Sequence, residues 1–339
     1  MFQRRRVLDG MFLTGLGLLG WLLYVFVSSA ILIAAPQQDS PQLSWQYDWH
    51  VYLAGARALV DRSLYRGALT LDGFPLPVEV FNQTPFAGAW ALPFLPLDVV
   101  TGGSIWLALM VISIAGGMIV SVAVLGLPHP VLLAGIGLLA YSLSPWFWID
   151  VLLGNINGLM FLLVAAFAWL HLHGRARAAG LILGIAIATK PWPLAFLPLL
   201  ARERRWQEMR WAMAFVLLQA IVFLGWLGVD VLPRMAAQIT SPVPISEGVP
   251  VFGWSLIRET YELPVWGGLV VGLLLLAVPA RGRIGLGIAI LAGLTLLVVN
   301  LWQHYLPVLS LGLLLVIIPV ARHVWVAFRP GGRRSTTEP

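Results

Sequence analysis

The sequence has no cysteine and very little charge. Without cysteine, the chain of 339 residues contains no disulfide and no thiolate that could bind a metal or act as a nucleophile. Charged residues make up 11% of the chain, whereas soluble domains carry about a quarter. A soluble globular domain is therefore excluded, and the formal net charge of +6 does not indicate a nucleic-acid partner.

Several catalytic motifs are absent as well. The sequence contains no P-loop, no G-x-S-x-G, no H-E-x-x-H and no kinase signature. It also lacks a D-x-D carboxylate pair, so a soluble, metal-dependent enzyme that uses nucleotide sugars is not expected. No internal repeat is evident, which counts against transporter folds built from duplicated halves.

Apolar sequence dominates the chain. Hydrophobic residues account for 59% of it, and the mean hydropathy is +0.87. Sixteen tryptophans and twenty-three prolines are typical of interfacial anchors and interrupted membrane helices. These features predict an all-α, polytopic transmembrane helical bundle of about 9–11 membrane segments, for which about 20 apolar residues make one full span.

Charge bias predicts the topology. Arg4, Arg5 and Arg6 precede a first apolar span at 11–35, so we expect a cytoplasmic N-terminus. An outer loop at 36–84 follows, and a second outer loop is expected at 230–263. We predict one membrane domain over 1–329 and a disordered cytoplasmic tail over 330–339.

Two segments leave the span count open. Residues 85–98 carry three prolines, and residues 178–200 are interrupted at Lys190-Pro191. If both segments cross fully, Arg175 and Arg177 lie outside, against the positive-inside rule. If 85–98 is re-entrant and Lys190-Pro191 forms the tip of a two-helix hairpin, every basic cluster lies inside. We favour the second solution.

Asp48 is the leading candidate for catalysis. It begins a stretch in which Asp48, Tyr52, Gly55 and Leu59 share one helical face, which predicts an amphipathic helix on the outer side. A carboxylate there can act as a general base toward an attacking hydroxyl. Capping of the helix N-terminus is an equally ordinary role for an aspartate.

Lys190 is the second candidate. It lies within apolar sequence, where a charge at a helix centre costs at least about 2.5–3.5 kcal/mol. A snorkelling lysine is the simple interpretation, and a cation that meets an anionic group in a cavity is the functional one. Asn155 and Asn157, between two glycines, could cap a helix or offer amide groups to a sugar or a phosphate.

The remaining candidates are weaker. His304 could donate to a phosphate or carry a proton because its pKa lies near neutral. Arg57 is an outer-side cation that could meet the same phosphate. Tyr52 and Trp49 complete the predicted substrate-binding set, although an interfacial aromatic belt is a simpler interpretation of Trp49.

Taken in order, these residues resemble a known family. The matching pieces run from Asp48-Trp49-His50-Val51-Tyr52 through Gly154-Asn155-Ile156-Asn157 and Lys190-Pro191 to Trp302-Gln303-His304-Tyr305. They resemble glycosyltransferase family 87 (DUF2029) in the GT-C superfamily, which includes polyprenol-phosphate-mannose-dependent mannosyltransferases. One departure is Gln83-Thr84-Pro85, where family members often have Tyr-Pro-Pro.

The resemblance implies a function. A hexose, by analogy mannose, would move from a polyprenyl-phosphate sugar to a lipid or glycan acceptor on the outer face of the plasma membrane. Asp48 would be the catalytic base and His304 a second catalytic residue, and no cofactor or metal would be needed. Two other functions fit the composition: a lipid or solute transporter or flippase, and a non-catalytic scaffold that binds polyprenyl lipid.

Overall fold

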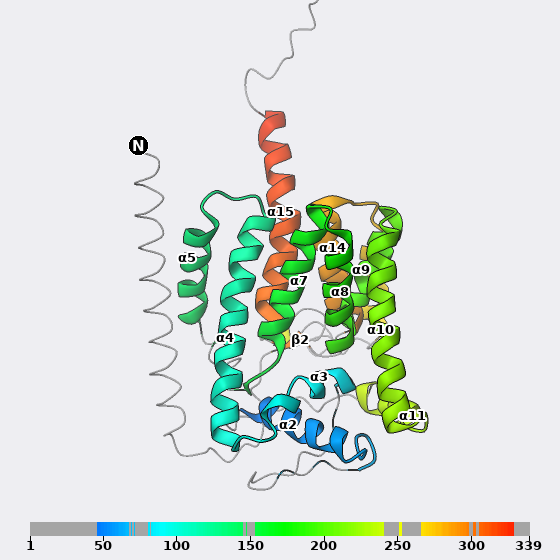
Figure 1. Ribbon diagram of the computed structural model, residues 1–339. Coiled ribbons are helices and arrows are strands. Elements are labelled where there is room, and N and C mark those ends of the chain that lie inside the picture. The colour runs from blue at the N-terminus through cyan, green and yellow to red at the C-terminus, as the bar shows by residue number, and fades with distance from the viewer. Residues whose placement is uncertain are drawn as a thin grey trace, which may run out of the picture.

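The computed structural model describes residues 46–67, 69, 71, 81, 83–144, 147, 153–240, 251–252, 266–297, 301–302 and 305–328. The expected first span at 11–35, His304 and the expected tail at 330–339 lie outside these residues. The described part is a bundle of upright helices closed at one end by short helices that lie across it (Figure 1). It confirms the all-α membrane fold.

The upright helices form the body of the bundle. They are α4 (Val99–Val124), α5 (Pro130–Ser142), α7 (Asn157–Leu172), α8 (Ala176–Thr189), α9 (Phe196–Arg202), α10 (Trp206–Leu227), α13 (Trp266–Ala277), α14 (Gly282–Leu297) and α15 (Leu306–Phe328). Helix α7 packs against α4 and α8, α8 against α10, and α14 against α13 and α15. Three of these helices, α4, α10 and α15, are long and apolar enough to cross a membrane.

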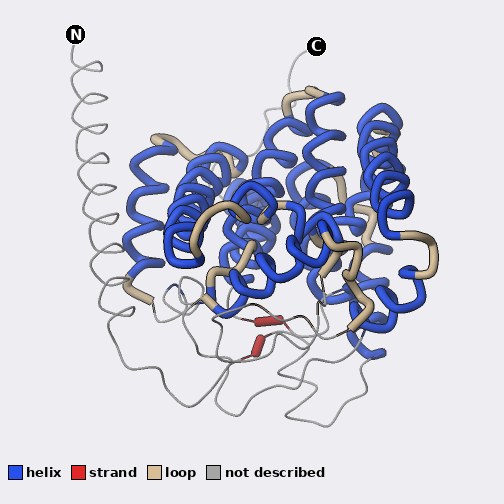
Figure 2. Tube along the Cα trace, turned by 60° about the horizontal axis from the view of Figure 1, so that its bottom comes forward, coloured by secondary structure: helices blue, strands red, loops and turns tan. Residues whose placement is uncertain are grey.

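Helices α2 (Tyr47–Val60), α3 (Pro85–Ala89) and α11 (Val231–Thr240) lie at the lower end in Figure 1. The other short elements are η2 (Leu92–Phe94), η3 (Trp192–Ala195), β1 (Val251–Phe252) and β2 (Leu301–Trp302). The two strands pair antiparallel and lie side by side in Figure 2. Helix α11 occupies the start of the segment that we expected to be an outer loop.

The segments 85–98 and 178–200, whose course the sequence left undecided, are arranged in the structure as in the solution that we favour. Residues 85–98 form α3 and η2 at the lower end and do not cross the bundle, as expected of a re-entrant segment (Figure 1). Helix α8 ends at Thr189 because Lys190, which precedes a proline, takes an extended backbone. Residues 192–202 then turn back, so Lys190-Pro191 is the tip of a hairpin.

The two ends of the bundle differ in charge. We call the upper end of Figure 1 the arginine end, because the turns there and the helix residues next to them include Arg175, Arg177, Arg202, Arg204, Arg205, Arg281 and Arg283. We call the lower end, with α2 and α3, the aspartate end. Arg202 donates to the carbonyls of Val278 (2.6 Å) and Ala280 (3.2 Å), which ties two of the arginine-end turns together.

Small residues let α8 and α10 approach closely. Gly180 and Gly184 lie four residues apart on one face of α8, the spacing that brings membrane helices together. A Cβ added at Gly184 would lie 2.8 Å from the Ala212 carbonyl oxygen on α10, which is closer than van der Waals contact allows. This contact fixes α8, and therefore Lys190, against the rest of the bundle.

Helix α2 is enclosed rather than laid on the surface. Of its 14 residues, only Arg57 and Val60 are exposed. Trp226 at the end of α10 donates its indole N–H to the Leu59 carbonyl (2.7 Å), and the guanidinium of Arg62 lies 4.0 Å above the Trp226 ring. The expected helix is present at the expected end, but it is buried on nearly all sides.

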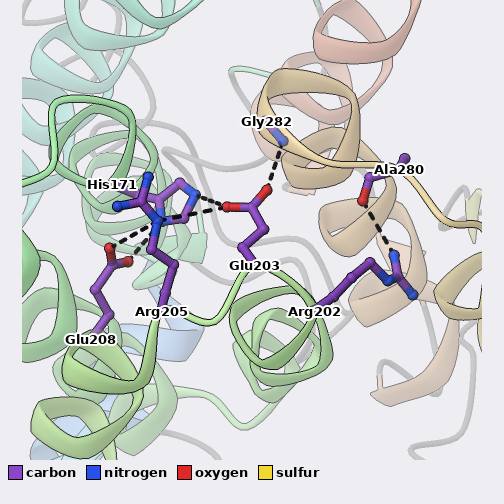
Figure 3. A network of polar contacts seen from close by, with 7 residues as sticks. All are labelled: His171, Arg202, Glu203, Arg205, Glu208, Ala280 and Gly282. Carbon is purple, nitrogen blue, oxygen red and sulfur yellow. Dashed lines mark hydrogen bonds and ion pairs between the residues drawn. The ribbon is translucent and has the colours of Figure 1, made fainter.

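A buried ionic network joins three helices at the arginine end (Figure 3). His171 on α7 places Nε2 3.0 Å from Glu203 and Nδ1 2.7 Å from Glu208. Glu203 also accepts the backbone N–H of Gly282 (2.7 Å), and the Arg205 guanidinium lies 3.9 Å from both carboxylates. Both imidazole nitrogens thus lie within hydrogen-bond distance of a carboxylate oxygen.

This network predicts a stability effect. Glu208 is fully buried, and removing one partner of a buried ion pair typically costs about 3–5 kcal/mol because the other charge is left uncompensated. We therefore expect Glu208→Ala to lower the midpoint of thermal unfolding in detergent sharply. Gln207→Ala, at the exposed neighbouring position, should change it little, and equal midpoints for the two variants would contradict the role of the network.

Candidate functional site

Asp48 lies in the first turn of α2, but it does not cap the helix. Gln46 occupies the cap position with a left-handed backbone (φ 55°) and makes no side-chain cap bond. Instead, Oδ2 of Asp48 accepts a hydrogen bond from Nδ2 of Asn155, 2.7 Å away. The residue as a whole is partly buried, and its carboxyl group is directed into the bundle toward Asn155.

Asn155 is positioned by a tight turn before α7. Gly154 has φ +65°, and a Cβ there would lie 3.2 Å from Cβ of Trp49, so glycine suits both the backbone angle and the close approach. The Gly154 carbonyl accepts the indole N–H of Trp106 (2.7 Å). Oδ1 of Asn155 accepts the backbone N–H of Asn157 (3.0 Å), so Asn155 also helps to begin the helix.

Lys190 does not snorkel. It is 6% exposed, and it is the only lysine among the 21 lysine and arginine residues of the chain. Its ammonium donates to Oδ1 of Asn157 (2.9 Å), Oδ1 of Asn155 (3.3 Å) and the hydroxyl of Tyr305 (3.3 Å). It also lies 5.1 Å from the centre of the Tyr305 ring. The ammonium has three N–H groups, so these three oxygens can together accept all of them.

The donor and acceptor chemistry of these groups fixes the two amides. An ammonium can only donate hydrogen bonds and an ionised carboxylate can only accept them, so both Asn side chains must turn their oxygens to Lys190. Their nitrogens then point away from it. Nδ2 of Asn155 reaches Asp48, whereas Nδ2 of Asn157 is buried and has no hydrogen-bond partner in the described part of the chain.

The site therefore has a cation, Lys190, at one side and a carboxyl group, Asp48, at the other. Lys190 and Asp48 make no direct ion pair, because the Asn155 amide stands between them. Burial raises the pKa of the Asp48 carboxyl above its ordinary value of 3.8, while the Asn155 hydrogen bond and the charge of Lys190 lower it again. The Asp48 carboxyl group can accept a hydrogen bond, and Nδ2 of Asn157 can donate one. Because both belong to one hydrogen-bonded group, the site suits a ligand that has both a hydroxyl and an acceptor oxygen.

A second set of contacts, which we did not predict, holds the Lys190 hairpin in place. The Thr84 hydroxyl accepts the backbone N–H of Ala87 (3.2 Å) and donates to the carbonyls of Ala188 and Thr189. Trp90 donates to the Thr189 hydroxyl (3.0 Å). One threonine thus caps α3 and the end of α8 together.

The other predicted site residues are placed differently. Trp49 is fully buried between Phe94 and Trp106, and the hydroxyl of the buried Tyr52 accepts the Ile156 N–H at 3.5 Å. Both side chains therefore pack beneath the site and hold its residues in place. Arg57 is exposed and lies nine residues beyond Asp48, about half a turn away around the helix. Tyr305, next to the predicted His304, was missed although it belongs to the same sequence motif.

Two cavities lie elsewhere. They have volumes of about 380 and 470 Å³, and their lining includes arginines of the arginine end. Neither is lined by Asp48, Asn155 or Lys190.

Comparison with known proteins bears on this arrangement. The model of "Glycosyltransferase family 87" matches residues 81–324, which include Asn155, Asn157, Lys190 and Tyr305. An α-(1→3)-arabinofuranosyltransferase of Corynebacterium glutamicum is 40% identical over 55 residues, which are 16% of this chain and 13% of that protein. The match therefore covers a small part of that relative's length. No solved structure matches the chain.

Proposed function

The chain belongs to glycosyltransferase family 87 and is a membrane glycosyltransferase, and from that premise we propose the reaction that it catalyses. A hexose, specifically mannose, is transferred from a polyprenyl-phosphate sugar to a hydroxyl of a lipid or glycan acceptor. The transfer inverts the anomeric configuration and takes place at the aspartate end, on the outer face of the plasma membrane. Neither a cofactor nor a metal ion takes part.

One observation carries this proposal. Asp48, Asn155 and Lys190 form a continuous, largely buried hydrogen-bonded group at the end of the bundle opposite the arginine-rich turns (Figure 1). Basic residues are enriched in cytoplasmic loops, which supports assigning the arginine end to the cytoplasm. The aspartate end then faces outward, and α15 runs toward the arginine end, which is consistent with a cytoplasmic C-terminus.

The mechanism is a single displacement. Asp48 takes the proton of the acceptor hydroxyl, whose oxygen forms a bond to the anomeric carbon as the bond from that carbon to the phosphate oxygen breaks. The products are the inverted glycoside, a protonated Asp48 and the polyprenyl phosphate anion. A phosphate needs little help from a general acid, but its charge must be stabilised electrostatically.

The roles of the neighbouring residues follow from their contacts. Lys190 supplies the positive charge that favours ionised Asp48 and stabilises the departing phosphate, and it holds both amides in one orientation. Nδ2 of Asn157 donates to an oxygen of the donor substrate. Trp49 and Tyr52 position the group formed by Asp48, Asn155 and Lys190. The exposed Arg57 binds the polyprenyl phosphate at the surface. His304 remains the second proposed catalytic residue.

The sugar has a second candidate. The Corynebacterium glutamicum protein that is similar over 55 residues is named as an arabinofuranosyltransferase, so arabinofuranose is the alternative to mannose. Membranes that contain the protein should be supplied in turn with polyprenyl-phosphate mannose, polyprenyl-phosphate arabinofuranose and a nucleotide sugar. We expect transfer from the first, retained in EDTA, with the anomeric configuration inverted in the product. Transfer only from the nucleotide sugar would refute the donor class, and lipid movement without a new glycosidic bond would indicate a flippase.

The Asn155 amide predicts a shift in pH dependence. Since this hydrogen bond lowers the pKa of Asp48, Asn155→Ala should raise that pKa further. A base must be ionised, so transfer falls as pH drops through the pKa of Asp48, and this fall should occur at higher pH in the variant. Asn157→Ala, which leaves the Asp48 contact in place, should keep the acid limb and instead raise KM for the donor. Identical pH profiles for the wild type and Asn155→Ala would contradict the assignment.

A further inference from the structure

A small cluster of basic side chains at the arginine end has no acidic partner among the residues that the structure describes. It lines the cavity of about 380 Å³, whose residues are Leu125, Arg283, Pro319, Arg322 and His323. They come from the end of α4, the start of α14 and the part of α15 that continues toward its C-terminus beyond the neighbouring helices (Figure 1). The cavity therefore opens where three helices reach the arginine end of the bundle.

Arg283 is held across the end of α4. Its Nε donates to the Val124 carbonyl (2.7 Å), one of the last carbonyls of that helix. Gly126 has φ +66°, and a Cβ there would lie 3.0 Å from a terminal nitrogen of Arg283. Glycine thus makes room for the guanidinium. In the described part of the chain, the terminal N–H groups of Arg283 have no hydrogen-bond partner, so the fork remains available.

Within the described part of the chain, the arginine charges of this cluster are not compensated by an acidic side chain. No carboxylate of the described residues pairs with Arg283, Arg322 or His323, whereas Arg205 in the neighbouring cavity lies 3.9 Å from both Glu203 and Glu208. Arg322 and His323 are exposed and make no described hydrogen bond. Arg283 and Arg322 can therefore each bind an anion from outside the chain without first giving up a partner among the described residues.

The lining combines this charge with apolar surface from Leu125 and Pro319. An arginine fork matches the oxygens of a phosphate, and basic pockets between membrane helices on the cytoplasmic side suit anionic headgroups. We propose that the cavity binds the phosphate headgroup of an anionic glycerophospholipid, with Arg283 and Arg322 on the phosphate. Inorganic phosphate shares the anionic chemistry but offers nothing to the apolar part of the lining.

The test measures lipid binding rather than sugar transfer. Purified protein in neutral detergent is titrated with phosphatidylglycerol, phosphatidylcholine or inorganic phosphate, and bound lipid is followed by native mass spectrometry and thermal unfolding. The test variant is Arg322→Gln/His323→Gln, which spares the Arg283 contact with α4. The control is Arg175→Gln/Arg177→Gln, which removes exposed charges at the same end but outside the cavity.

We expect phosphatidylglycerol to bind the wild type and raise its unfolding midpoint, and phosphatidylcholine to do neither. The test variant should bind phosphatidylglycerol about fivefold more weakly because it loses the charge of Arg322, whereas the control should match the wild type. If both variants bound phosphatidylglycerol equally weakly, the effect would come from general surface charge, and the proposed site would be wrong. An equal rise in the midpoint with inorganic phosphate would overturn the lipid assignment.

Discussion

Asp48→Asn is expected to abolish sugar transfer while leaving the fold and donor binding intact. Asparagine is nearly isosteric with aspartate, and its oxygen can still accept the Asn155 hydrogen bond that Asp48 accepts at 2.7 Å. It cannot take a proton from the acceptor hydroxyl. Loss of a general base costs about 10²–10⁴-fold in rate, so kcat should fall by that factor with little change in KM for the donor.

The same helix offers a matched control. Asp61 is an exposed carboxylate at the C-terminal end of α2, so Asp61→Asn makes the same chemical change outside the site. Initial rates in membranes with matched expression, together with thermal unfolding of both variants, separate catalysis from folding. Wild-type turnover in Asp48→Asn would remove Asp48 as the base, although the chain would remain a glycosyltransferase.

Replacing Lys190 is the second change with a large expected effect. Lys190→Met keeps the length of the side chain but removes the cation that orients two amides and favours ionised Asp48. Loss of one electrostatic stabiliser of a transition state typically costs about 10²–10³-fold in kcat. We expect a loss of that order, together with a shift of the acid limb of the pH profile to higher pH.

Lys190→Arg distinguishes charge from geometry. A planar guanidinium does not reproduce the compact, three-donor ammonium that reaches Asn155, Asn157 and Tyr305, so this variant should also lose most of its activity. Tyr305→Phe, which removes one acceptor and keeps the charge, should lose only a few-fold. Full activity in Lys190→Arg would mean that a positive charge anywhere in this space is sufficient, contrary to the proposed orienting role.

Much of the architecture was predictable because membrane sequences carry strong local signals. The three prolines of 85–98 and the break at Lys190-Pro191 left two arrangements open. The positive-inside rule favoured the one in which 85–98 does not cross and Lys190-Pro191 is the tip of a hairpin. The bias of arginine toward particular turns then placed Asp48, Asn155 and Lys190 at one end of the bundle, where the structure also has them.

The contacts within the site were not predictable, because they depend on which side chains meet across long separations. Helical periodicity placed Asp48 and Tyr52 on one face of an exposed helix. Helix α2 is instead enclosed on nearly all sides, so the side chains of Trp49 and Tyr52 pack in the core. Likewise, nothing local in the sequence signals that Thr84 caps the end of α8, or that His171 lies between two glutamates.

Localisation of a bound donor analogue tests the account most directly. The structure of the protein would be determined by electron cryo-microscopy with a non-hydrolysable polyprenyl-phosphonate mannose. We predict that the sugar lies beside Asp48 at the aspartate end, with a phosphonate oxygen within hydrogen-bond reach of Nδ2 of Asn157. An analogue bound at the arginine end, or at the aspartate end with Asp48 turned away from the anomeric carbon, would contradict the proposed site.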